Sequence, residues 1–452
     1  MTETRFDLVA IGGGSAGLGA VRAAAREGRS AALISDGPLG GDCTFTGCVP
    51  SKALLAASAR GADFAQAMQH VQSVIGEVAA LENAEVLTSE GVTVIAQRAT
   101  FVNSSTLQVG DDTVVADNIV VATGARPVAP PIPGLDDVGY LTNETLFQLA
   151  EKPTHLLIVG GGPIGCEMAT AFVRLGVPVT VLEMAPRIMN RDDADAAAVV
   201  HSSLADLGVT IHTGAAITAF RADVGGIVAV VNDEEIVGSH VLVAAGRKAN
   251  TSGFGLEALG VALKPNGCID VRPTMASSIK GIWGAGDVTG EHPFSHSADE
   301  MGRLAAQNSA KRLRRRSFVA TEVPYGTFTT PEVAQVGLTE EQAPTGSRIA
   351  LSTFEDSDRG LATNERTGFV KLIAGPRRVL GWTGGGKLIG ATIVHERAGE
   401  MIHEPALIIA NNMFPGRMAQ LVHAYPTWSI AIRKAASMFY VEVDGKNYRT
   451  KS

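Results

Sequence analysis

The sequence has 452 residues, enough for about three domains, and its 38 basic and 46 acidic side chains give a formal net charge of −8. The acidic balance argues against a nucleic-acid partner, the 45% hydrophobic content excludes a disordered chain, and four cysteines are too few for a disulfide scaffold. A polar N-terminus and the lack of an apolar run of about 18 residues predict a cytoplasmic protein with no signal peptide and no membrane span.

The 51 glycines gather beside apolar runs, and the first cluster follows a predicted strand at Phe6–Ile11. Gly12, Gly14 and Gly17 fit the spacing G-x-G-x-x-G, and a helix and a second strand, Ser30–Ile34, follow them. In that spacing the first glycine makes a tight turn, the second lets backbone approach a pyrophosphate, and the third lets the helix close on the sheet. The segment therefore predicts a dinucleotide-binding unit.

The same pattern returns later in the chain. A strand at Leu156–Val159 is followed by Gly160, Gly162 and Gly165, then by a helix and a strand at Val179–Leu182. The strand–glycine–helix context is met in both copies, so the sequence predicts two bound dinucleotides.

An acidic residue at the end of the second strand would confirm each site, because it accepts a hydrogen bond from a ribose hydroxyl. In the second copy Glu183 lies there, 23 residues after Gly160, and favours NADH because it repels a 2′-phosphate. Arg187 lies close and argues for NADPH. In the first copy the same step reaches Ser35, and the acid is Asp36, one residue later. Either residue is a candidate ribose contact, and Asp36 has the alternative role of a turn residue.

Three later glycine clusters each end a predicted strand. They are Ala122–Ala125, Gly246–Arg247 and Gly284–Asp287, and the last leads into a helix predicted near Glu300–Arg314. After about Thr321 the chain changes to alternating strand-like runs and two helical patterns, which predict a separate α+β domain.

The most specific segment is Gly40–Lys52, in which Cys43 and Cys48 lie five residues apart between glycines. In an ideal helix the α-carbons of such a pair are roughly 8–9 Å apart, whereas a disulfide needs roughly 4.4–6.8 Å, so the turn must be distorted. Cys48 is predicted near the start of a helix with Lys52 about one turn on, and both the helix dipole and the cation lower a thiol pKa. We therefore interpret Cys48 as the thiolate-prone member of a redox pair and Cys43 as the more exposed exchange thiol.

Two other interpretations of this pair stay open from the residues alone. The cysteines could be buried structural residues, or they could form half of a zinc site, which needs two more ligands at suitable spacing. Cys166 and Cys268 are far away inside other elements and are predicted to be ordinary core thiols, so no metal site is expected.

These residues resemble the flavoprotein pyridine nucleotide-disulfide oxidoreductase family (class I), which includes dihydrolipoyl dehydrogenase, glutathione reductase and mercuric reductase. The resemblance covers essentially the whole chain in order and is greatest to the mercuric reductase-like and dihydrolipoyl dehydrogenase-like branch. The motifs that carry it are the two glycine fingerprints, Gly40–Lys52, Ala122–Gly124, Glu167, Gly246–Arg247, Gly284–Asp287 and Phe328–Glu332.

The resemblance implies an α/β fold with two Rossmann-like dinucleotide-binding domains, for FAD and NAD(P), and a C-terminal α+β dimerisation domain. The expected boundaries are residues 1–143 and 273–322 for the two parts of the FAD-binding domain, 144–272 for the NAD(P)-binding domain and 323–452 for the dimerisation domain.

The resemblance also implies a mechanism. Nicotinamide delivers hydride to FAD, and two electrons then pass to a Cys43–Cys48 disulfide, with Cys48 nearest the flavin and Cys43 meeting the outgoing acceptor. Lys52 is expected beside the flavin and paired with Glu167. The residues expected to hold FAD and NADH or NADPH are Gly12, Gly14, Gly17, Ser35, Asp36, Gly41, Lys52, Thr123, Gly124, Gly160, Gly162, Gly165, Glu183, Gly246, Gly286 and Asp287.

The chain departs from the disulfide-reducing members near its C-terminus. Those members carry His-Pro-x-x-x-Glu, in which the histidine reaches the partner subunit's cysteines and moves a proton, and the glutamate orients it. Here Tyr425 stands at the histidine position and Ile430 at the glutamate position, so a base poised near neutrality is missing. His423 could substitute. Tyr425 resembles a tyrosine that mercuric reductase places beside its metal, but that enzyme's C-terminal cysteine pair and N-terminal metal-binding extension are missing.

The sequence therefore predicts an FAD-dependent NAD(P)H oxidoreductase that passes electrons through Cys43 and Cys48 to a small acceptor, namely a soft metal ion, a quinone, a small oxidant or a disulfide. One alternative is a dihydrolipoyl dehydrogenase-type disulfide reductase that uses His423 as its base. Another is a nucleotide-binding flavoprotein with a mainly non-catalytic role. A homodimer is expected because, in the family arrangement, Tyr425 reaches the active site only from the other subunit.

Overall fold

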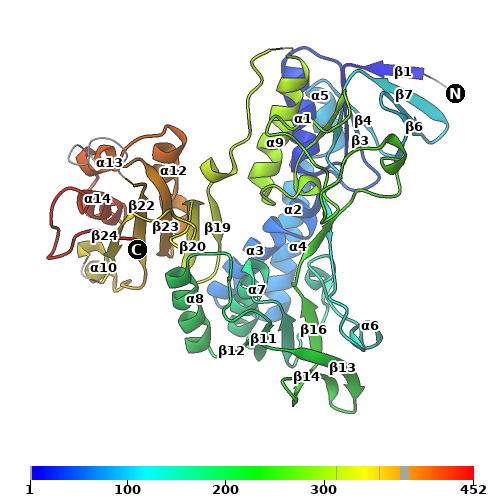
Figure 1. The fold of residues 1–452 in the computed structure, drawn as a ribbon. Helices are drawn as coiled ribbons and strands as arrows, with labels where there is room; N and C mark the ends of the chain where they lie inside the picture. Colours follow the sequence, from blue (N-terminus) through cyan, green and yellow to red (C-terminus); the bar gives the residue numbers. More distant parts are fainter. Residues whose placement is uncertain (1–2, 312, 356, 377–385) are drawn as a thin grey trace. The chain divides into compact units, whose positions relative to one another are not determined.

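The structure is a computed structural model that describes residues 3–311, 313–355, 357–376 and 386–452. The chain forms two compact units, each assembled from separate stretches of sequence (Figure 1). The first unit comprises Met1–Pro131, Tyr140–Lys152 and Leu242–Ala320, and the second comprises Ile132–Gly139, Pro153–Val241 and Thr321–Ser452.

The first unit is built on a five-stranded parallel sheet. Its order is β18 (Ile282–Gly284), β8 (Ile119–Val121), β2 (Leu8–Ile11), β3 (Ala31–Ile34) and β4 (Val92–Ile95). The inner strands are buried on both faces, which explains why they are continuous apolar runs rather than alternating ones. The late strand β18 brings its glycine cluster to the sheet that carries the first fingerprint.

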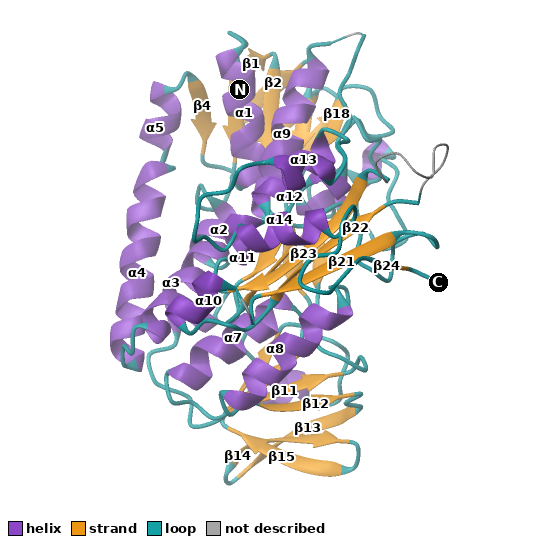
Figure 2. Ribbon diagram, turned by 90° about the vertical axis from the view of Figure 1, so that its left-hand side faces the viewer, coloured by secondary structure: helices purple, strands orange, loops and turns teal. Residues whose placement is uncertain are grey.

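Two helices cover this sheet side by side, α1 (Ser15–Arg26) and α9 (Ser295–Ser309), as both ribbon views show (Figures 1 and 2). Their contact is close because a Cβ at Gly302 would lie 2.0 Å from the Ala16 carbonyl oxygen. The helix that was predicted near Glu300–Arg314 is α9, which begins earlier, at Ser295, and ends earlier, at Ser309.

The remaining elements of the first unit surround this core. Four helices follow β3, and α4 begins with a capping box of Asp63 and Gln66. They are α2 (Gly41–Phe45), α3 (Cys48–Ala59), α4 (Phe64–Leu81) and α5 (Ala84–Ser89). A four-stranded sheet has the order β1 (Glu3–Phe6), β7 (Asp112–Ala116), β6 (Thr106–Val109) and β5 (Ala99–Asn103), and a two-stranded ribbon pairs β17 (Arg247–Ala249) with β9 (Ala125–Pro127).

The second unit contains the other glycine fingerprint. Its sheet has the order β12 (Thr210–Thr213), β11 (Val179–Glu183), β10 (Leu156–Val159) and β16 (His240–Val243). The strands β10, β11 and β12 are parallel, and α7 (Pro163–Arg174) and α8 (Ala194–Asp206) pack beside them. A three-stranded antiparallel sheet of β13 (Ile217–Asp223), β14 (Gly226–Val231) and β15 (Glu234–Gly238) completes this part.

The C-terminal part of the second unit is an antiparallel sheet with helices, in agreement with the predicted α+β texture (Figure 2). The strand order is β19 (Tyr325–Thr327), β20 (Glu332–Gly337), β23 (Leu388–His395), β22 (Phe369–Ala374), β21 (Arg348–Thr353) and β24 (Arg449–Thr450). Its helices are α10 (Asp358–Thr363), α11 (Ala398–Met401), α12 (His403–Ala410), α13 (Gly416–Gln420) and α14 (Ile430–Ser437). The helices α12 and α14 pack on β23 and β22, and close an apolar core.

A buried lysine ties this antiparallel sheet to the nucleotide-binding part of the same unit. Lys371 on β22 is 1% exposed, and its Nζ lies 2.7 Å from Asp193, 2.6 Å from Asp195 and 3.0 Å from Glu340. Asp193 also caps α8, so the cation stabilises both the helix start and the contact between the two parts.

Candidate active site

The first glycine turn lies between β2 and α1 and has the geometry that the spacing requires. Gly12 has a φ of +111°, and a Cβ on Gly17 would lie 1.9 Å from the Gly12 carbonyl oxygen. A Cβ on Gly14 would meet no atom within 4 Å, so this glycine is not required by internal packing. Its lack of a side chain instead leaves a cradle at the N-terminus of α1, where backbone N–H groups suit a pyrophosphate.

The second glycine turn, between β10 and α7, repeats this geometry closely. Gly160 has a φ of +109°, a Cβ on Gly165 would lie 2.0 Å from the Gly160 carbonyl oxygen, and a Cβ on Gly162 would meet nothing within 4 Å. Cys166 is buried in this turn and its Sγ donates to the Gly161 carbonyl at 3.3 Å, as expected for a core thiol.

The acidic residue of the second copy is held against its own glycine turn. Glu183 ends β11, and its Oε2 and Oε1 accept from the N–H groups of Gly161 at 2.6 Å and Ala185 at 2.7 Å. The guanidinium of Arg187 is engaged elsewhere, because it contacts the Glu341 carboxylate and donates to the carbonyl oxygens of Met189 and Asp192.

In the first copy the two candidate ribose contacts, Ser35 and Asp36, lie in different surroundings. A Cβ on Gly13 would lie 2.9 Å from the Ser35 hydroxyl, so Ser35 occupies the place that Glu183 has beside the second turn. Asp36 is exposed and lies 3.5 Å from Arg98. Ser35 thus lies beside the glycine turn, whereas Asp36 lies at a surface pair, and a ribose contact by either residue stays a prediction.

The later glycine clusters come together with the first turn. Gly286, with a φ of +79°, would place a Cβ 3.1 Å from the Ala16 side chain, and Gly41 would place one 2.8 Å from Gly14. Next to Gly286, burial raises the pKa of Asp287, and the neighbouring Arg247 opposes this shift. Three clusters from distant parts of the sequence thus line one cradle.

The Ala122–Ala125 cluster is fixed at the same edge of the first unit. Gly124 has a φ of +67°, and the hydroxyl of Thr123 donates to the Asn250 carbonyl at 2.6 Å while the Asn250 amide donates back at 3.0 Å. The cluster therefore ends β8 in a turn that is held by the strand following Gly246.

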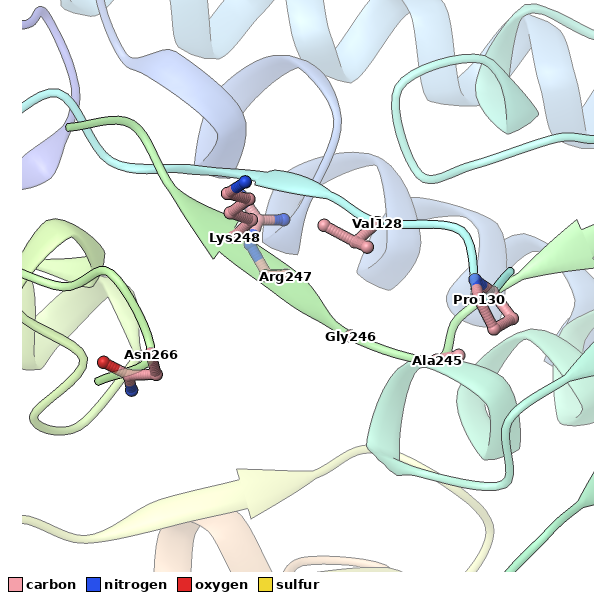
Figure 3. Close-up of a pocket in the computed structure, with 7 residues that line it drawn as sticks. All are labelled: Val128, Pro130, Ala245, Gly246, Arg247, Lys248 and Asn266. Carbon is pink, nitrogen blue, oxygen red and sulfur yellow. The ribbon is translucent and has the colours of Figure 1, made fainter. Parts of the chain in front are cut away.

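A cavity of about 280 Å³ lies beside the β9–β17 ribbon of the first unit (Figure 3). Figure 3 shows Arg247 and Lys248 on β17 and Asn266 on a separate loop. The lining residues are Val128, Pro130, Ala245, Gly246, Arg247, Lys248 and Asn266. Lys248 and the amide of Asn266 give the cavity a polar lining, whereas the Arg247 guanidinium is engaged by Asp42 and the Ala125 carbonyl oxygen.

The cysteine segment is distorted as its spacing requires. The short helix α2 ends at Phe45, Gly47 adopts a non-helical conformation, and Cys48 is the first residue of α3. A Cβ on Gly47 would lie 2.8 Å from the Asp42 carbonyl oxygen, so this turn needs glycine. The expected place of Cys48 at a helix start is thus confirmed, and the helix N-terminus favours its thiolate.

In the polypeptide alone Cys48 is exposed and Cys43 is half-buried. Which of the two thiols meets the acceptor in the enzyme with its flavin stays a prediction. The hydrogen bond between the two thiols and burial raise the pKa of Cys43, whereas contact with Ser295 lowers it. The Ser295 hydroxyl also lies 3.3 Å from the Cys48 sulfur, so one hydroxyl serves both sulfurs.

Lys52 and Glu167 belong to different units. Lys52 is half-buried in α3 of the first unit. Glu167 is 5% exposed in α7 of the second unit, where its Oε1 accepts from the Phe328 N–H at 2.9 Å. Their mutual pairing stays a prediction.

The C-terminal segment of the second unit presents a tyrosine and hides a histidine. Tyr425 is 71% exposed, and a hydrogen bond from its hydroxyl to Asp358 raises its pKa. The His423 ring is 4% exposed, with Nε2 3.2 Å from both Glu404 carboxylate oxygens and Nδ1 3.0 Å from the Leu421 carbonyl oxygen. Both ring nitrogens of His423 are therefore engaged within its own chain.

Comparisons with known proteins agree with this geometry. Residues 6–309 match the family described as pyridine nucleotide-disulphide oxidoreductase, and residues 323–436 match the dimerisation domain of that family. The chain belongs to the pyridine nucleotide-disulphide oxidoreductase family. Its members include a mercuric reductase from Streptomyces lividans, 35% identical over 98% of each chain, and a dihydrolipoyl dehydrogenase from Bacillus subtilis, 30% identical over 95% of this chain and 97% of that one.

Solved structures of the family are also similar. The HOCl-induced flavoprotein disulfide reductase RclA from Escherichia coli matches with a TM-score of 0.86 and 28% identity, covering 95% of this chain and 99% of that one. Its Cu(II) complex matches with a TM-score of 0.87 and 27% identity, over 96% and 99%. LpdA from Mycobacterium tuberculosis matches with a TM-score of 0.86 and 30% identity, over 96% and 99%.

The family assignment makes this chain an FAD-dependent NAD(P)H oxidoreductase with a dimerisation domain. The residues fit both cofactors, because each glycine turn leaves room at Gly14 or Gly162 where a Cβ would project into the cradle. No helix in the described part of the chain is long and apolar enough to cross a membrane.

Three site features were not predicted from the sequence. They are the contact of Ser295 with the cysteines, the ion pairs of the Arg247 guanidinium and the contact of Glu404 with His423. Arg247 had a signal, since it follows Gly246 at a strand end. Ser295 and Glu404 had none, because each acts on a residue far away in the sequence.

Proposed function

We propose that this enzyme delivers its electrons to a thiophilic metal ion at Cys43 and Cys48. The observation that carries the proposal is the C-terminal segment, where Tyr425 and Ile430 replace an acid–base pair and His423 directs both nitrogens inward. A disulfide acceptor releases a thiolate that must take a proton from a general acid with a pKa near neutrality, whereas a metal ion needs no proton. The mercuric reductase relatives and the Cu(II) complex of RclA are consistent with such an acceptor.

The chain's own residues have the following roles in this proposal. FAD held at the Gly12, Gly14 and Gly17 turn would supply the two-electron chemistry that links NAD(P)H to the cysteine pair. Cys43 and Cys48 hold the pair as two thiols, and Ser295 together with the N-terminus of α3 favours the thiolate. When the thiols form their disulfide they release two protons and two electrons, which reduce one Hg²⁺ ion to the metal or two Cu²⁺ ions to Cu⁺.

We also propose NADH as the preferred coenzyme. Glu183 is fixed by two backbone N–H groups at the end of β11, where a carboxylate accepts from a ribose hydroxyl and repels a 2′-phosphate. Arg187 is held by Glu341 and two carbonyl oxygens, so it is not directed at a phosphate. A comparison of kcat/KM for NADH and NADPH tests this, and a preference for NADPH would contradict it.

We further propose a homodimer that uses the dimerisation domain. The segment around Tyr425 exposes Val422 at 88% and Leu421 at 53%, and Leu407 of α12 at 64%. Large apolar side chains exposed to this extent in a dimerisation domain favour burial against a second copy. Light scattering of the fully active enzyme tests this, since an active monomer would contradict it.

An acceptor screen under NADH tests the metal proposal. Wild type is expected to oxidise NADH with Hg²⁺ or Cu²⁺ and to show negligible turnover with lipoamide, and Cys43→Ser is expected to lose the metal activity. Tyr425→His combined with Ile430→Glu should gain lipoamide turnover. Fast lipoamide reduction that is lost in His423→Ala would instead establish the dihydrolipoyl dehydrogenase alternative, and fast quinone reduction without metal reduction would also refute the proposal.

A further inference from the structure

The cysteine turn is anchored by side chains from three distant parts of the first unit. The Asp42 carboxylate forms an ion pair with Arg247, and the Thr44 hydroxyl donates to Glu82 at 3.0 Å. The Thr46 carbonyl oxygen accepts from the amide of Asn143 at 3.2 Å. The residue before Cys43 and two of the four residues between the cysteines are thus held by contacts outside the turn.

Among these anchors, the Arg247 guanidinium has the most connections. Besides Asp42, it donates to the Ala125 carbonyl oxygen at 2.5 Å, and its Nε lies 3.6 Å from Asp287. Ala125 and Asp287 follow the two glycine clusters that line the first cradle with Gly12. Arg247 therefore connects the residue before Cys43 to the edge of the unit that holds the cofactor.

From this arrangement we propose that Arg247 and Asp42 form a positioning pair for the Cys43–Cys48 couple, which keeps the two sulfurs within reach of each other once they are reduced. The proposal rests on the redox role of the cysteines in the proposed function, and not on the identity of the acceptor. Neither side chain is a catalytic residue, since both act through the backbone of the turn.

The physical reason is the entropy of the reduced turn. Breaking a disulfide lets the intervening residues move apart, and that gain in freedom favours the dithiol. An ion pair that fixes Asp42 removes part of this freedom, so it raises the effective concentration of one thiol at the other and favours the disulfide. The exposed fractions are 25% for the Arg247 side chain and 48% for Asp42, so the pair is only partly screened by water.

The charges of the pair also matter for Cys43. A carboxylate directly before a cysteine disfavours its thiolate, and a guanidinium on that carboxylate offsets the effect. Removing Arg247 alone therefore leaves an uncompensated charge beside Cys43, whereas Asp42→Asn removes the charge and keeps an oxygen that accepts from Arg247.

The thiol–disulfide equilibrium of the holoenzyme with glutathione tests the proposal. In this exchange the protein dithiol and glutathione disulfide give the protein disulfide and two glutathione thiols, and trapped thiols are counted by mass spectrometry. Arg247→Met and Asp42→Ala are each expected to lower the equilibrium constant about fivefold, and the double variant no further, because the two residues act as a pair. Asp42→Asn and Arg247→Lys should recover part of the loss.

Arg221→Met is a matched control, because Arg221 forms a surface ion pair with Glu235 in the second unit and should leave the constant unchanged. Equal constants in wild type and all variants would overturn the positioning role, as would fully additive losses. If Arg247→Met does not fold, Asp42→Ala and Asp42→Asn still decide the question. Failure of wild type to form any Cys43–Cys48 disulfide would instead refute the redox pair of the proposed function.

Discussion

Replacing Ser295 by alanine is expected to make the cysteine pair a weaker acid. Its hydroxyl lies 3.3 Å from the Cys48 sulfur and contacts Cys43 as well, where it lowers the thiol pKa. When one sulfur ionises, the hydroxyl can turn its proton toward the thiolate, which the methyl group of alanine cannot do. The change removes a hydrogen bond without adding volume.

The size of the effect follows from the site. A hydrogen bond to a charged acceptor contributes about 1.5–3 kcal/mol when it is well formed. Because Cys48 begins α3, the helix N-terminus supplies part of the stabilisation after the hydroxyl is lost. We therefore expect a loss of about 1 kcal/mol, which raises the apparent pKa of the pair by roughly 0.7 unit.

The rate at which iodoacetamide alkylates the reduced protein, measured against pH, reports this pKa because only the thiolate reacts. The midpoint should move upward in Ser295→Ala and stay near wild type in Ser295→Thr, which keeps a hydroxyl. Ser58→Ala is the control, since Ser58 lies in the same helix as Cys48 but donates to the Leu55 carbonyl. An unchanged midpoint in a folded Ser295→Ala protein would show that the hydroxyl does not act on the sulfurs.

Three further predictions concern stability and cofactor binding. Lys371→Met leaves the buried Asp193 carboxylate without its cation and should cost about 3–5 kcal/mol of unfolding free energy by denaturant titration, whereas Lys434→Met, at a surface pair, should cost less than about 1 kcal/mol. Burial raises the pKa of Asp192 from 3.8 to about 6, so its ionisation destabilises the fold increasingly between these pH values, and Asp192→Asn should raise Tm above pH 6 but not below pH 3.8. Gly14→Ala should keep the wild-type Tm of the apoprotein but bind FAD about tenfold less tightly, whereas Gly17→Ala should lower the Tm of the apoprotein, because only the Cβ at residue 17 meets backbone. Equal losses of stability in the two lysine variants, a Tm difference for Asp192→Asn that does not change with pH, or equal Tm values in the two glycine variants would each contradict the corresponding prediction.

The parts of the site that depend on backbone geometry could be predicted from the sequence. The positive φ of Gly12 and the close approach of Gly17 to its carbonyl oxygen require glycine at both positions, and the same holds for Gly160 and Gly165. Gly47 is likewise required by the turn between the cysteines. Such constraints act within a few residues, so they appear as a local pattern.

The parts that depend on pairing between distant side chains could not be predicted. His423 is engaged by Glu404 on α12, and the cysteines are contacted by Ser295 at the start of α9. Such contacts depend on how helices pack against one another, and they produce no regular residue spacing that could be recognised in the sequence.

The central claim, that a metal ion takes its electrons from the cysteine pair, is tested most directly by counting reduced metal in a single turnover. Holoenzyme is reduced without oxygen by one equivalent of NADH and mixed with Cu²⁺, and Cu⁺ is counted with a chelating dye while remaining thiols are counted in parallel. We predict two Cu⁺ ions and the loss of two thiols per subunit in wild type, and no Cu⁺ above background in Cys43→Ser. Full Cu⁺ production in Cys43→Ser, or Cu⁺ formed with both thiols intact, would contradict the claim.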